Sequence, residues 1–317
     1  MDARRWRKRL KNDVLYVLIR LLGGAVRALS TVPARRLMRA LGRGVYLASP
    51  GLRHLTFENL RLAFGDELSE REIRRLARRV FEDLGVNAAD ALRLDRIQPT
   101  SLVTSESFHV VREALALRRG LLVATGHVGN WEVLGAYLAS RGVPLTALAA
   151  RIYDPRLDRL VTRLREAVGV RTIRHNRSGF GMARVLKAGG ALGVLVDVRQ
   201  ERLGQVVRFF GRPVHAVDGP FQLAVRFGTP VVFACAWRRR DGGYRAEFEL
   251  LEPPPGLDGR RKVAWLLQAC TDRLESVIRR VPSQWIWMHP RWEPVAESKI
   301  RAPRKAAKVR RKAVAKV

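Results

Sequence analysis

The segment LLVATGHVGNWE, residues 121–132, combines a predicted buried strand with the start of a predicted helix. Leu121–Thr125 is a compact apolar run, which is typical of a strand covered on both faces. Gly126 and His127 end this run, and helical spacing of apolar residues begins at Asn130. The segment therefore predicts a strand, a sharp turn and a helix, with a histidine at the carboxyl end of the strand.

Predicted strands and helices alternate from there to residue 280. The further strands are Leu145–Ala149, Val170–Ile173, Ala191–Val196, Pro230–Trp237 and Tyr244–Leu251, and the helices are Asn130–Ser140, Asp154–Val168, Phe180–Lys187, Pro220–Phe227 and Asp258–Arg280. This alternation indicates an α/β fold with a central sheet flanked by helices. The turn Asp241-Gly242-Gly243 predicts a hairpin before the last strand, which would make the sheet mixed.

Residues 14 to about 94 are predicted to be mainly helical. Apolar residues recur at helical spacing over Leu52–Phe64 and from Ser69 to about Leu94, and Ser69 with Glu72 is the signature of a capping box. Residues 14–48 resemble one or two apolar helices, with Pro33 in the turn between them. We divide the chain into a basic arm with an N-terminal helix (1–48), a main domain (49–298) and a basic tail (299–317) that we expect to be disordered.

The charge of the chain is strongly unbalanced. Its 317 residues carry a net charge of +31, with six Lys or Arg in residues 4–11 and nine in residues 299–317, which implies a polyanionic partner. The apolar run Val14–Leu29 contains Arg20 and Arg27 and is short for a membrane span. We therefore expect it to attach the chain to an anionic membrane surface, as an amphipathic or marginal transmembrane anchor, although a buried first helix would show the same pattern.

Two cysteines and the absence of a clear signal peptide indicate a reducing compartment, with no disulfide and no zinc site. We expect no metal and no cofactor.

His127 and Glu132 form the pattern His-x4-Glu across the turn from strand to helix. The carboxylate could fold back and orient the imidazole, whose other nitrogen would then act as a general base near neutral pH. Gly126 and Gly129 would allow close backbone approach beside this base. The pattern alone is weak, because a hydrogen-bonded histidine at a strand end is common. Neither a His-Glu-x-x-His zinc motif nor a dinucleotide-binding loop fits the spacing.

Beyond this pattern, residues 125–135 resemble the catalytic block of the lipid A biosynthesis late acyltransferases, the lauroyl and myristoyl transferases. That family also includes the mycobacterial phosphatidylinositol mannoside acyltransferases. Four further blocks resemble the family in the same order: Glu58–Phe64, Gly181–Asp197, Phe209–Ala224 and Gln284–Trp292. Five ordered blocks over about residues 50–295 are far more specific than any one of them.

The resemblance implies a glycerolipid-acyltransferase-like fold at the cytoplasmic face of a bacterial inner membrane. It implies transfer of a fatty acyl chain from an acyl-carrier protein or acyl-CoA to a hydroxyl of a lipid A precursor or related glycolipid. His127 would be the base and Glu132 its partner, with Asp197 as an alternative orienting acid. The sequence Val198-Arg199-Gln200-Glu201 departs from the family pattern and leaves the acceptor side open.

Other residues are candidates by position. Arg174, Arg177 and Arg151 follow predicted strands and could contact an oxyanion or a phosphate. Arg156, Arg159 and Arg163 share a helix face that could bind anionic headgroups or simply be solvated. Four residues are candidates for an acyl groove or the acceptor side: Trp131, Phe209, Phe210 and Gly211. Packing in the core explains the phenylalanines equally well. Packing would also explain Trp285, Trp287 and Trp292, which could instead line a channel or lie at a membrane interface.

Two alternatives remain open at this point. The enzyme could act on another lipid acceptor, such as a mannolipid or an aminolipid. Outside the enzymes, the charge fits a nucleic-acid-binding protein, but no helix-turn-helix, zinc or RNA-recognition signature is present, so we expect no specific nucleic acid partner. DNA binding that vanishes with salt would be ordinary charge attraction.

Overall fold

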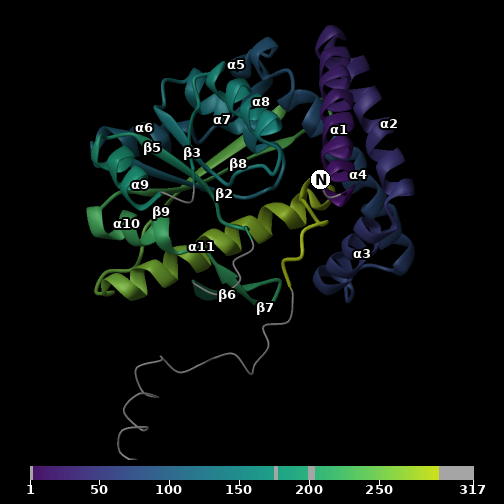
Figure 1. Cartoon of the computed structure of the whole chain (residues 1–317). Helices are drawn as coiled ribbons and strands as arrows, with labels where there is room; N and C mark the ends of the chain where they lie inside the picture. The colour runs from purple at the N-terminus through teal and green to yellow at the C-terminus, as the bar shows by residue number, and fades with distance from the viewer. Residues whose placement is uncertain (1–2, 175–177, 199–203, 293–317) are drawn as a thin grey trace, which may run out of the picture.

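The computed structural model describes residues 3–174, 178–198 and 204–292 and is built around a seven-stranded sheet (Figure 1). The strand order is β1-β9-β8-β2-β5-β3-β4. The bounds are β1 Val103–Thr104, β2 Leu121–Thr125, β3 Leu145–Ala149, β4 Arg171–Arg174, β5 Ala191–Leu195, β8 Val231–Arg238 and β9 Tyr244–Leu251. β2 is parallel to both β5 and β8, whereas β8 and β9 are antiparallel. The predicted mixed α/β sheet is therefore confirmed.

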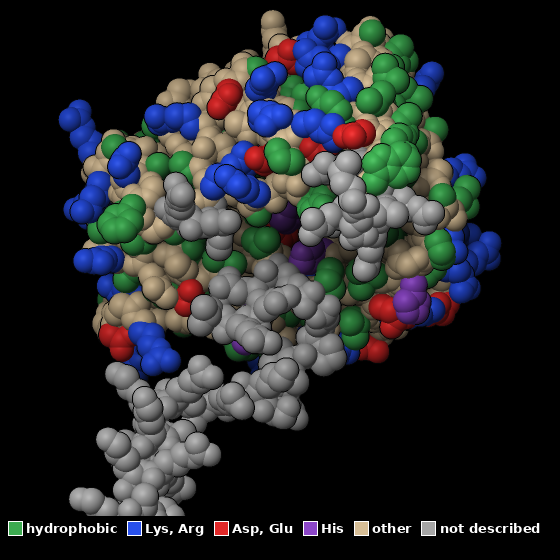
Figure 2. Space-filling view, in the orientation of Figure 1, with side chains coloured by type: hydrophobic (Ala, Val, Ile, Leu, Met, Phe, Trp, Pro, Cys, Tyr) green, Lys and Arg blue, Asp and Glu red, His purple; other side chains and the backbone are tan. Residues whose placement is uncertain are grey.

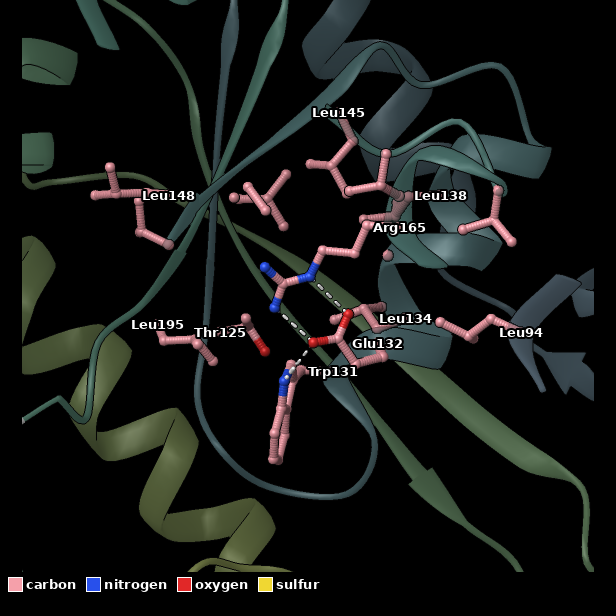
Figure 3. A pocket seen from close by; sticks show the side chains of 17 residues that line it. Leu94, Thr125, Trp131, Glu132, Leu134, Leu138, Leu145, Leu148, Arg165 and Leu195 are labelled. Carbon is pink, nitrogen blue, oxygen red and sulfur yellow. Dashed lines mark hydrogen bonds and ion pairs between the residues drawn. The ribbon is translucent and has the colours of Figure 1, made fainter. Parts of the chain in front are cut away.

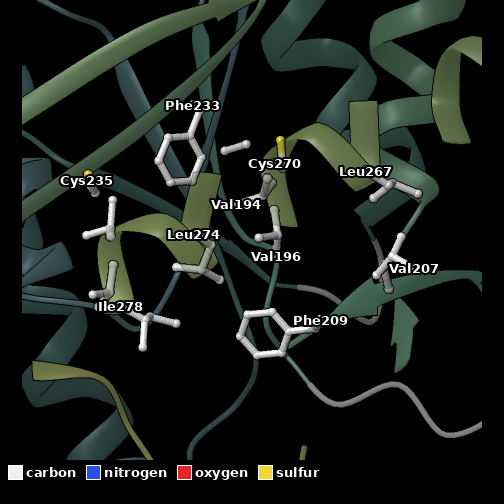
Figure 4. Packing of buried hydrophobic residues seen from close by; sticks show 14 of the residues in the cluster. Val194, Val196, Val207, Phe209, Phe233, Cys235, Leu267, Cys270, Leu274 and Ile278 are labelled. Atoms are coloured by element: carbon white, nitrogen blue, oxygen red, sulfur yellow. The ribbon is translucent and has the colours of Figure 1, made fainter. Parts of the chain in front are cut away.

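Helices cover both faces of the sheet. The helices of this part of the chain are α5 Pro99–Leu102, α6 Phe108–Ala116, α7 Trp131–Ser140, α8 Pro155–Glu166, α9 Ser178–Lys187, α10 Gly219–Phe227 and α11 Gly259–Arg280. Successive residues of β2 point to opposite faces. Leu121 and Val123 pack toward α6 and α7, whereas Leu122 and Ala124 pack toward α9, α10 and α11. Figure 4 shows part of this second core, where Leu274 of α11 lies near Val194.

Four N-terminal helices pack beside the sheet: α1 Ala3–Ala28, α2 Thr31–Ala48, α3 Pro50–Phe64 and α4 Glu70–Ala91 (Figure 1). The capping box of Ser69 and Glu72 at the start of α4 is confirmed. α2 and α4 cross at two glycines, where an added Cβ would lie 2.2 Å from the Phe81 carbonyl oxygen at Gly42 and 2.1 Å from the Met38 carbonyl oxygen at Gly85. Only glycine allows the two backbones this close approach.

The turn predicted at Pro33 was wrong by a few residues. The break between α1 and α2 falls at Leu29–Ser30, and Pro33 lies in the first turn of α2. Proline fits there because the first N–H groups of a helix have no partner within the helix. Helix α1 begins at Ala3, so the basic residues and the apolar run belong to one continuous helix. Among the described residues, no helix combines the length and apolar character that crossing a bilayer requires.

The main element missed by the sequence prediction is a hairpin of β6 (Gln205–Phe209) and β7 (Arg212–Ala216). Its two-residue turn is Phe210-Gly211, with φ of 49° and 72°. Positive φ at both positions matches a type I′ turn, but phenylalanine is rare at the first position. The hairpin therefore lacks the usual sequence signal. The basic tail, 299–317, lies outside the described residues.

Candidate active site

The register of two parallel strands brings His127 and Asp197 together. Thr125 of β2 pairs with Leu195 of β5, so each functional residue lies two positions beyond the paired strand ends. The His127 Nδ1 atom lies 2.8 Å from Asp197 Oδ1. This places the histidine at the carboxyl edge of the sheet, where ligands bind in open α/β sheets.

Asp197 is almost completely buried, with 4% of its surface exposed. Its Oδ2 atom accepts hydrogen bonds from the His127 backbone N–H, at 2.7 Å, and from the Trp285 indole N–H, at 2.8 Å. Burial raises the pKa of Asp197, but its interactions with His127 and the indole outweigh burial and lower it to about 2. Asp197 is therefore a carboxylate at neutral pH, and it can only accept a hydrogen bond from Nδ1–H of His127.

This arrangement leaves His127 Nε2 with a free lone pair when the imidazole is neutral. Burial lowers the pKa of His127, but the charge and hydrogen bond of Asp197, with a further contribution from the charge of Glu132, raise it above its ordinary value. About a fifth of the side chain is exposed (21%), so the ring remains accessible from outside.

Two glycines let the histidine loop fit between its neighbours, as the sequence predicted. A Cβ on Gly129 would lie 1.9 Å from the Ala236 carbonyl oxygen, and Gly129 has a φ of +61°. A Cβ on Gly126 would lie 2.5 Å from the Leu274 side chain and 3.1 Å from Asp197 Oδ2. Side chains at these positions would displace the backbone beside the base.

The predicted pairing of Glu132 with His127 was wrong. Both carboxylate oxygens of Glu132 bind Arg165, at 2.6 Å to Nη2 and 2.9 Å to Nε, and the Trp131 indole N–H donates to Oε1 at 3.1 Å. Glu132 lies in the first turn of α7, while Asp197 already occupies Nδ1 of the histidine. The alternative orienting acid named from the sequence is the one found in contact with the ring.

An apolar pocket lies beside the His127–Asp197 pair, between α7, α8 and the sheet (Figure 3). Its cavity volume is about 60 Å³. Polar lining atoms come from Thr125, Glu132, Arg165 and the Trp131 indole, and the remaining lining is aliphatic or glycine. Trp131 also packs edge-on against the His127 ring, with centroids 4.8 Å apart. The pocket and the histidine thus share a wall.

Comparison with known proteins decides the family. The sequence profile of bacterial lipid A biosynthesis acyltransferases matches residues 5–293. The chain belongs to this family. It is similar to the phosphatidylinositol mannoside acyltransferase of Mycolicibacterium smegmatis, with 27% identity over 183 residues, covering 56% of this chain and 59% of the relative. The protein of the same name from Mycobacterium tuberculosis is also 27% identical, over 56% of each chain. The match spans less than two thirds of either relative.

The arginine candidates of this family member differ in their surroundings. Arg174 binds Asp158 at 2.6 Å and Thr162 at 2.9 Å, so its guanidinium is directed to α8. Arg151 is exposed beyond the end of β3, and Arg177 lies outside the described residues. Arg156 pairs with Asp154 and Asp13 rather than facing solvent freely.

Phe209, Phe210 and Gly211 do not line the pocket. The two phenylalanines are buried in an aromatic cluster that we define by Phe64, Phe209, Phe210, Trp285, Trp287 and Trp292. Core packing, which the sequence could not separate from a groove wall, is what the structure shows for both. Gly211 forms the turn of the hairpin.

Arg165 is the site residue that sequence reasoning missed. A signal was present, since Arg165 falls on the same helical stripe as Val161 and Val168, where an arginine is unexpected. A charge in an apolar stripe requires a buried partner, which in this fold is Glu132. No three His, Cys, Asp or Glu side chains converge as metal ligands within residues 3–174, 178–198 and 204–292.

Proposed function

We propose that this protein transfers a fatty acyl chain from an acyl thioester to a hydroxyl group of a membrane glycolipid. The observation that carries the proposal is the His127–Asp197 pair at the sheet edge, sharing a wall with an apolar pocket. Family membership supports the same reaction class. We place the acyl chain in the pocket because its lining is aliphatic apart from a few polar groups.

The base acts through Nε2 in this mechanism. His127 removes the proton of the acceptor hydroxyl while the hydroxyl oxygen attacks the thioester carbonyl carbon. The tetrahedral intermediate collapses with cleavage of the C–S bond, and the imidazolium returns the proton to the departing thiolate. Asp197 holds Nδ1–H and stabilises the transient imidazolium, and the base needs no enzyme nucleophile between donor and acceptor.

We propose that the polar groups of Arg165 and Thr125 in the pocket wall stabilise the developing oxyanion. Among the described residues, the Arg165 guanidinium bonds Glu132 through Nε and Nη2 and keeps Nη1 free, and the buried Thr125 hydroxyl has no hydrogen-bond partner. Both residues line the pocket with Trp131 (Figure 3). A guanidinium and a hydroxyl in such a position suit a thioester carbonyl that gains negative charge. Arg174 and Arg151 remain candidates for acceptor phosphates.

We base our proposal for the class of acceptor lipid on the relatives of this chain. Two of them are named phosphatidylinositol mannoside acyltransferases, so a mannolipid hydroxyl is our first choice and a lipid A precursor the second. The basic surface suits either an acidic acyl-carrier protein or acyl-CoA as donor.

The test is acyl transfer by the purified full chain from radiolabelled palmitoyl-CoA or palmitoyl-carrier protein to each acceptor in mixed micelles. We expect product with one acceptor, and His127→Ala should lower the rate at least about 10²-fold with an unchanged circular dichroism spectrum. Transfer by His127→Ala at the normal rate would overturn the mechanism, and no transfer to any lipid hydroxyl would overturn the function.

We further propose that α1 and α2 dock on an anionic membrane surface, such as the cytoplasmic face of a bacterial inner membrane. Apolar side chains of α1 are exposed, including Leu18 at 57% and Leu21 at 67%. α2 exposes further apolar residues beside Arg36, Arg39 and Arg43 and contains no acidic residue. Figure 2 shows apolar and basic side chains mingled over the part of this face that α1 and α2 form. Such a surface fits lipid tails with anionic headgroups.

The docking proposal has a matched control on the far side of the sheet. Leu18→Asp with Leu21→Asp should reduce co-sedimentation with vesicles of phosphatidylglycerol and phosphatidylcholine at least about tenfold. Leu117→Asp, at a residue that is 55% exposed at the end of α6, should have little effect. Equal binding by both variants would exclude α1 as the docking surface.

A further inference from the structure

The indole of Trp285 is the one side-chain donor, besides the histidine ring, that the described structure gives to Asp197. Its N–H lies 2.8 Å from Oδ2, the oxygen that also accepts the His127 backbone N–H. Trp285 is 2% exposed and Asp197 4%, so water has little access to this carboxylate. Since an ionised carboxylate needs several donors when it is buried, the indole N–H has an electrostatic role as well as a packing role.

The backbone around Trp285 is tied to the histidine loop. Trp285 forms an antiparallel bridge with Val128, and the Gln284 carbonyl accepts the Gly129 N–H at 2.8 Å. The Gln284 side chain exchanges two hydrogen bonds, of 2.8 and 2.9 Å, with the backbone of Arg238 at the end of β8. The indole therefore approaches Asp197 from a segment whose position is fixed by the same loop that carries the base.

The ring is held by the aromatic cluster. Trp285 packs edge-on against Trp287, with centroids 4.7 Å apart, and against Phe209, at 5.6 Å. Trp287 is also fully buried, but its indole N–H donates to the Pro282 carbonyl at 2.6 Å. Two neighbouring tryptophans thus share one environment and differ in what their N–H groups bind.

We propose that Trp285 is a positioning residue of the acyl transfer reaction, holding the Asp197 carboxylate so that Oδ1 faces His127 Nδ1. This inference rests on the proposed function. Oδ2 is fixed by donors from two separate segments, and fixing one oxygen fixes the direction of the other. Without the indole N–H, a single backbone donor would remain on Oδ2, and the carboxylate could rotate about its Cβ–Cγ bond.

Among the described residues, the charged groups besides Asp197 that bear on a pH measurement of the base are Glu132, Arg165 and Arg291. Glu132 on α7 contributes to the raised pKa of His127, and Arg165 on α8 pairs with Glu132. Arg291, which is 7% exposed, donates to the carbonyls of Val198 and His215 and lies near enough to Asp197 to interact with its charge. None of these groups changes when the indole N–H is removed.

The test compares Trp285→Phe with Trp287→Phe in the labelled transfer assay. Each variant removes one buried indole and one hydrogen bond from the same cluster. We expect Trp285→Phe to lower kcat about 10- to 100-fold with KM for the thioester within about threefold, because a hydrogen bond to a charged group is lost. The acid limb of the pH profile should move to lower pH, since a carboxylate that is no longer held toward Nδ1 stabilises the imidazolium less. Trp287→Phe should leave kcat within about threefold and the limb unmoved.

A second variant removes the N–H without a cavity. Replacement of Trp285 by 3-benzothienylalanine, through stop-codon suppression, exchanges the N–H for sulfur in a ring of nearly the same shape. It should reproduce the loss of kcat and the shift of the acid limb. Equal kcat and equal pH profiles for the variants at positions 285 and 287 would overturn the positioning role, whereas full activity of His127→Ala would overturn the proposed function itself.

Discussion

Asp197 and Glu132 both lie near His127, but different kinds of donor hold their carboxylates. Asp197 follows β5 and receives hydrogen bonds from a backbone N–H, an indole N–H and the imidazole. Glu132 lies in the first turn of α7 and receives both of its short hydrogen bonds from the guanidinium of Arg165. One carboxylate is held by neutral groups, and the other is neutralised by a permanent cation.

This difference separates the two roles. The charge of Asp197 remains available to an imidazolium, because its other donors are neutral. The charge of Glu132 is matched by Arg165, and the pair lies on the pocket wall rather than on the histidine ring (Figure 3). A carboxylate five residues from the base in sequence is thus a worse partner than one 70 residues away, because strand register sets which side chains meet.

The largest effect that we expect comes from Asp197→Asn. Oδ2 accepts two N–H groups, so the amide oxygen will take that position and the NH2 group will face Nδ1. The imidazole must then carry its proton on Nε2, which removes the lone pair that the base needs. We expect kcat to fall about 10³- to 10⁴-fold with the fold intact.

Glu132→Gln sharpens this comparison in the same assay. The amide can still bind Arg165 through its oxygen, so we expect a loss of about tenfold, far less than at Asp197. A larger loss for Glu132→Gln than for Asp197→Asn would reverse the roles of the two carboxylates.

Besides removing the oxyanion contact that we propose for Arg165, Arg165→Leu is expected to lower the stability of the fold. It leaves the Glu132 carboxylate with only the Trp131 N–H in a site where 17% of that side chain is exposed. Breaking a buried pair from one side costs about 3–5 kcal/mol, and we expect the lower end because the site is not fully closed. Urea unfolding should show the loss, and adding Glu132→Gln should restore part of it. A double variant no more stable than Arg165→Leu would argue against an unpaired charge as the cause.

The sequence predicted the bounds of several strands and the functional residues at their ends, but it did not predict which carboxylate pairs with His127. β2, β3 and β9 match the predicted bounds, because a glycine or a proline lies directly beside each of these runs in the sequence. His127 and Asp197 were both recognised as strand-end residues. Choosing Asp197 over Glu132 required the sheet order, which places β5 next to β2 and cannot be read from local spacing.

The missed elements share a physical cause. The β6–β7 hairpin turns at Phe210, whose positive φ is stabilised by packing in the aromatic cluster rather than by a turn-forming residue. Arg165 and Trp285 act through tertiary contacts with Glu132 and Asp197, each from a distant segment. For each of these residues, contacts with distant parts of the chain decide its conformation or role, and the local sequence does not.

Gly135→Leu tests whether the acyl chain lies in the pocket that Glu132 and Arg165 line. Gly135 lines the pocket, and a Cβ there would be in ordinary contact, 3.7 Å from Leu145 and from Val170. The longer leucine side chain would occupy space that we assign to the acyl chain. Relative kcat/KM for palmitoyl over decanoyl thioester should fall about tenfold, as expected for lost methylene contacts. Ser140→Leu, at the exposed end of the same helix, should leave this ratio unchanged, and an unchanged ratio in Gly135→Leu would place the chain elsewhere.

The smallest effect is the pH dependence that the His127–Asp197 pair gives to stability. The raised pKa of His127 contributes stability that is complete below its unfolded value of about 6.5 and is lost as pH rises through the folded pKa. The pKa of Asp197, lowered to about 2, contributes stability that is present above about pH 3.9 and is lost as pH falls toward 2. Both contributions are therefore complete between about pH 4 and 6.5.

Asp197→Asn removes both contributions, so the difference in Tm between the wild type and this variant should be larger in that window than at pH 9, by about 2–4 °C for each kcal/mol of coupling. The matching comparison with Glu132→Gln should show a weaker dependence, because Glu132 contributes less to the pKa of the histidine. A Tm difference for Asp197→Asn that stays constant from pH 5 to pH 9 would mean that the pair gives the folded state no net preference for the protonated imidazole.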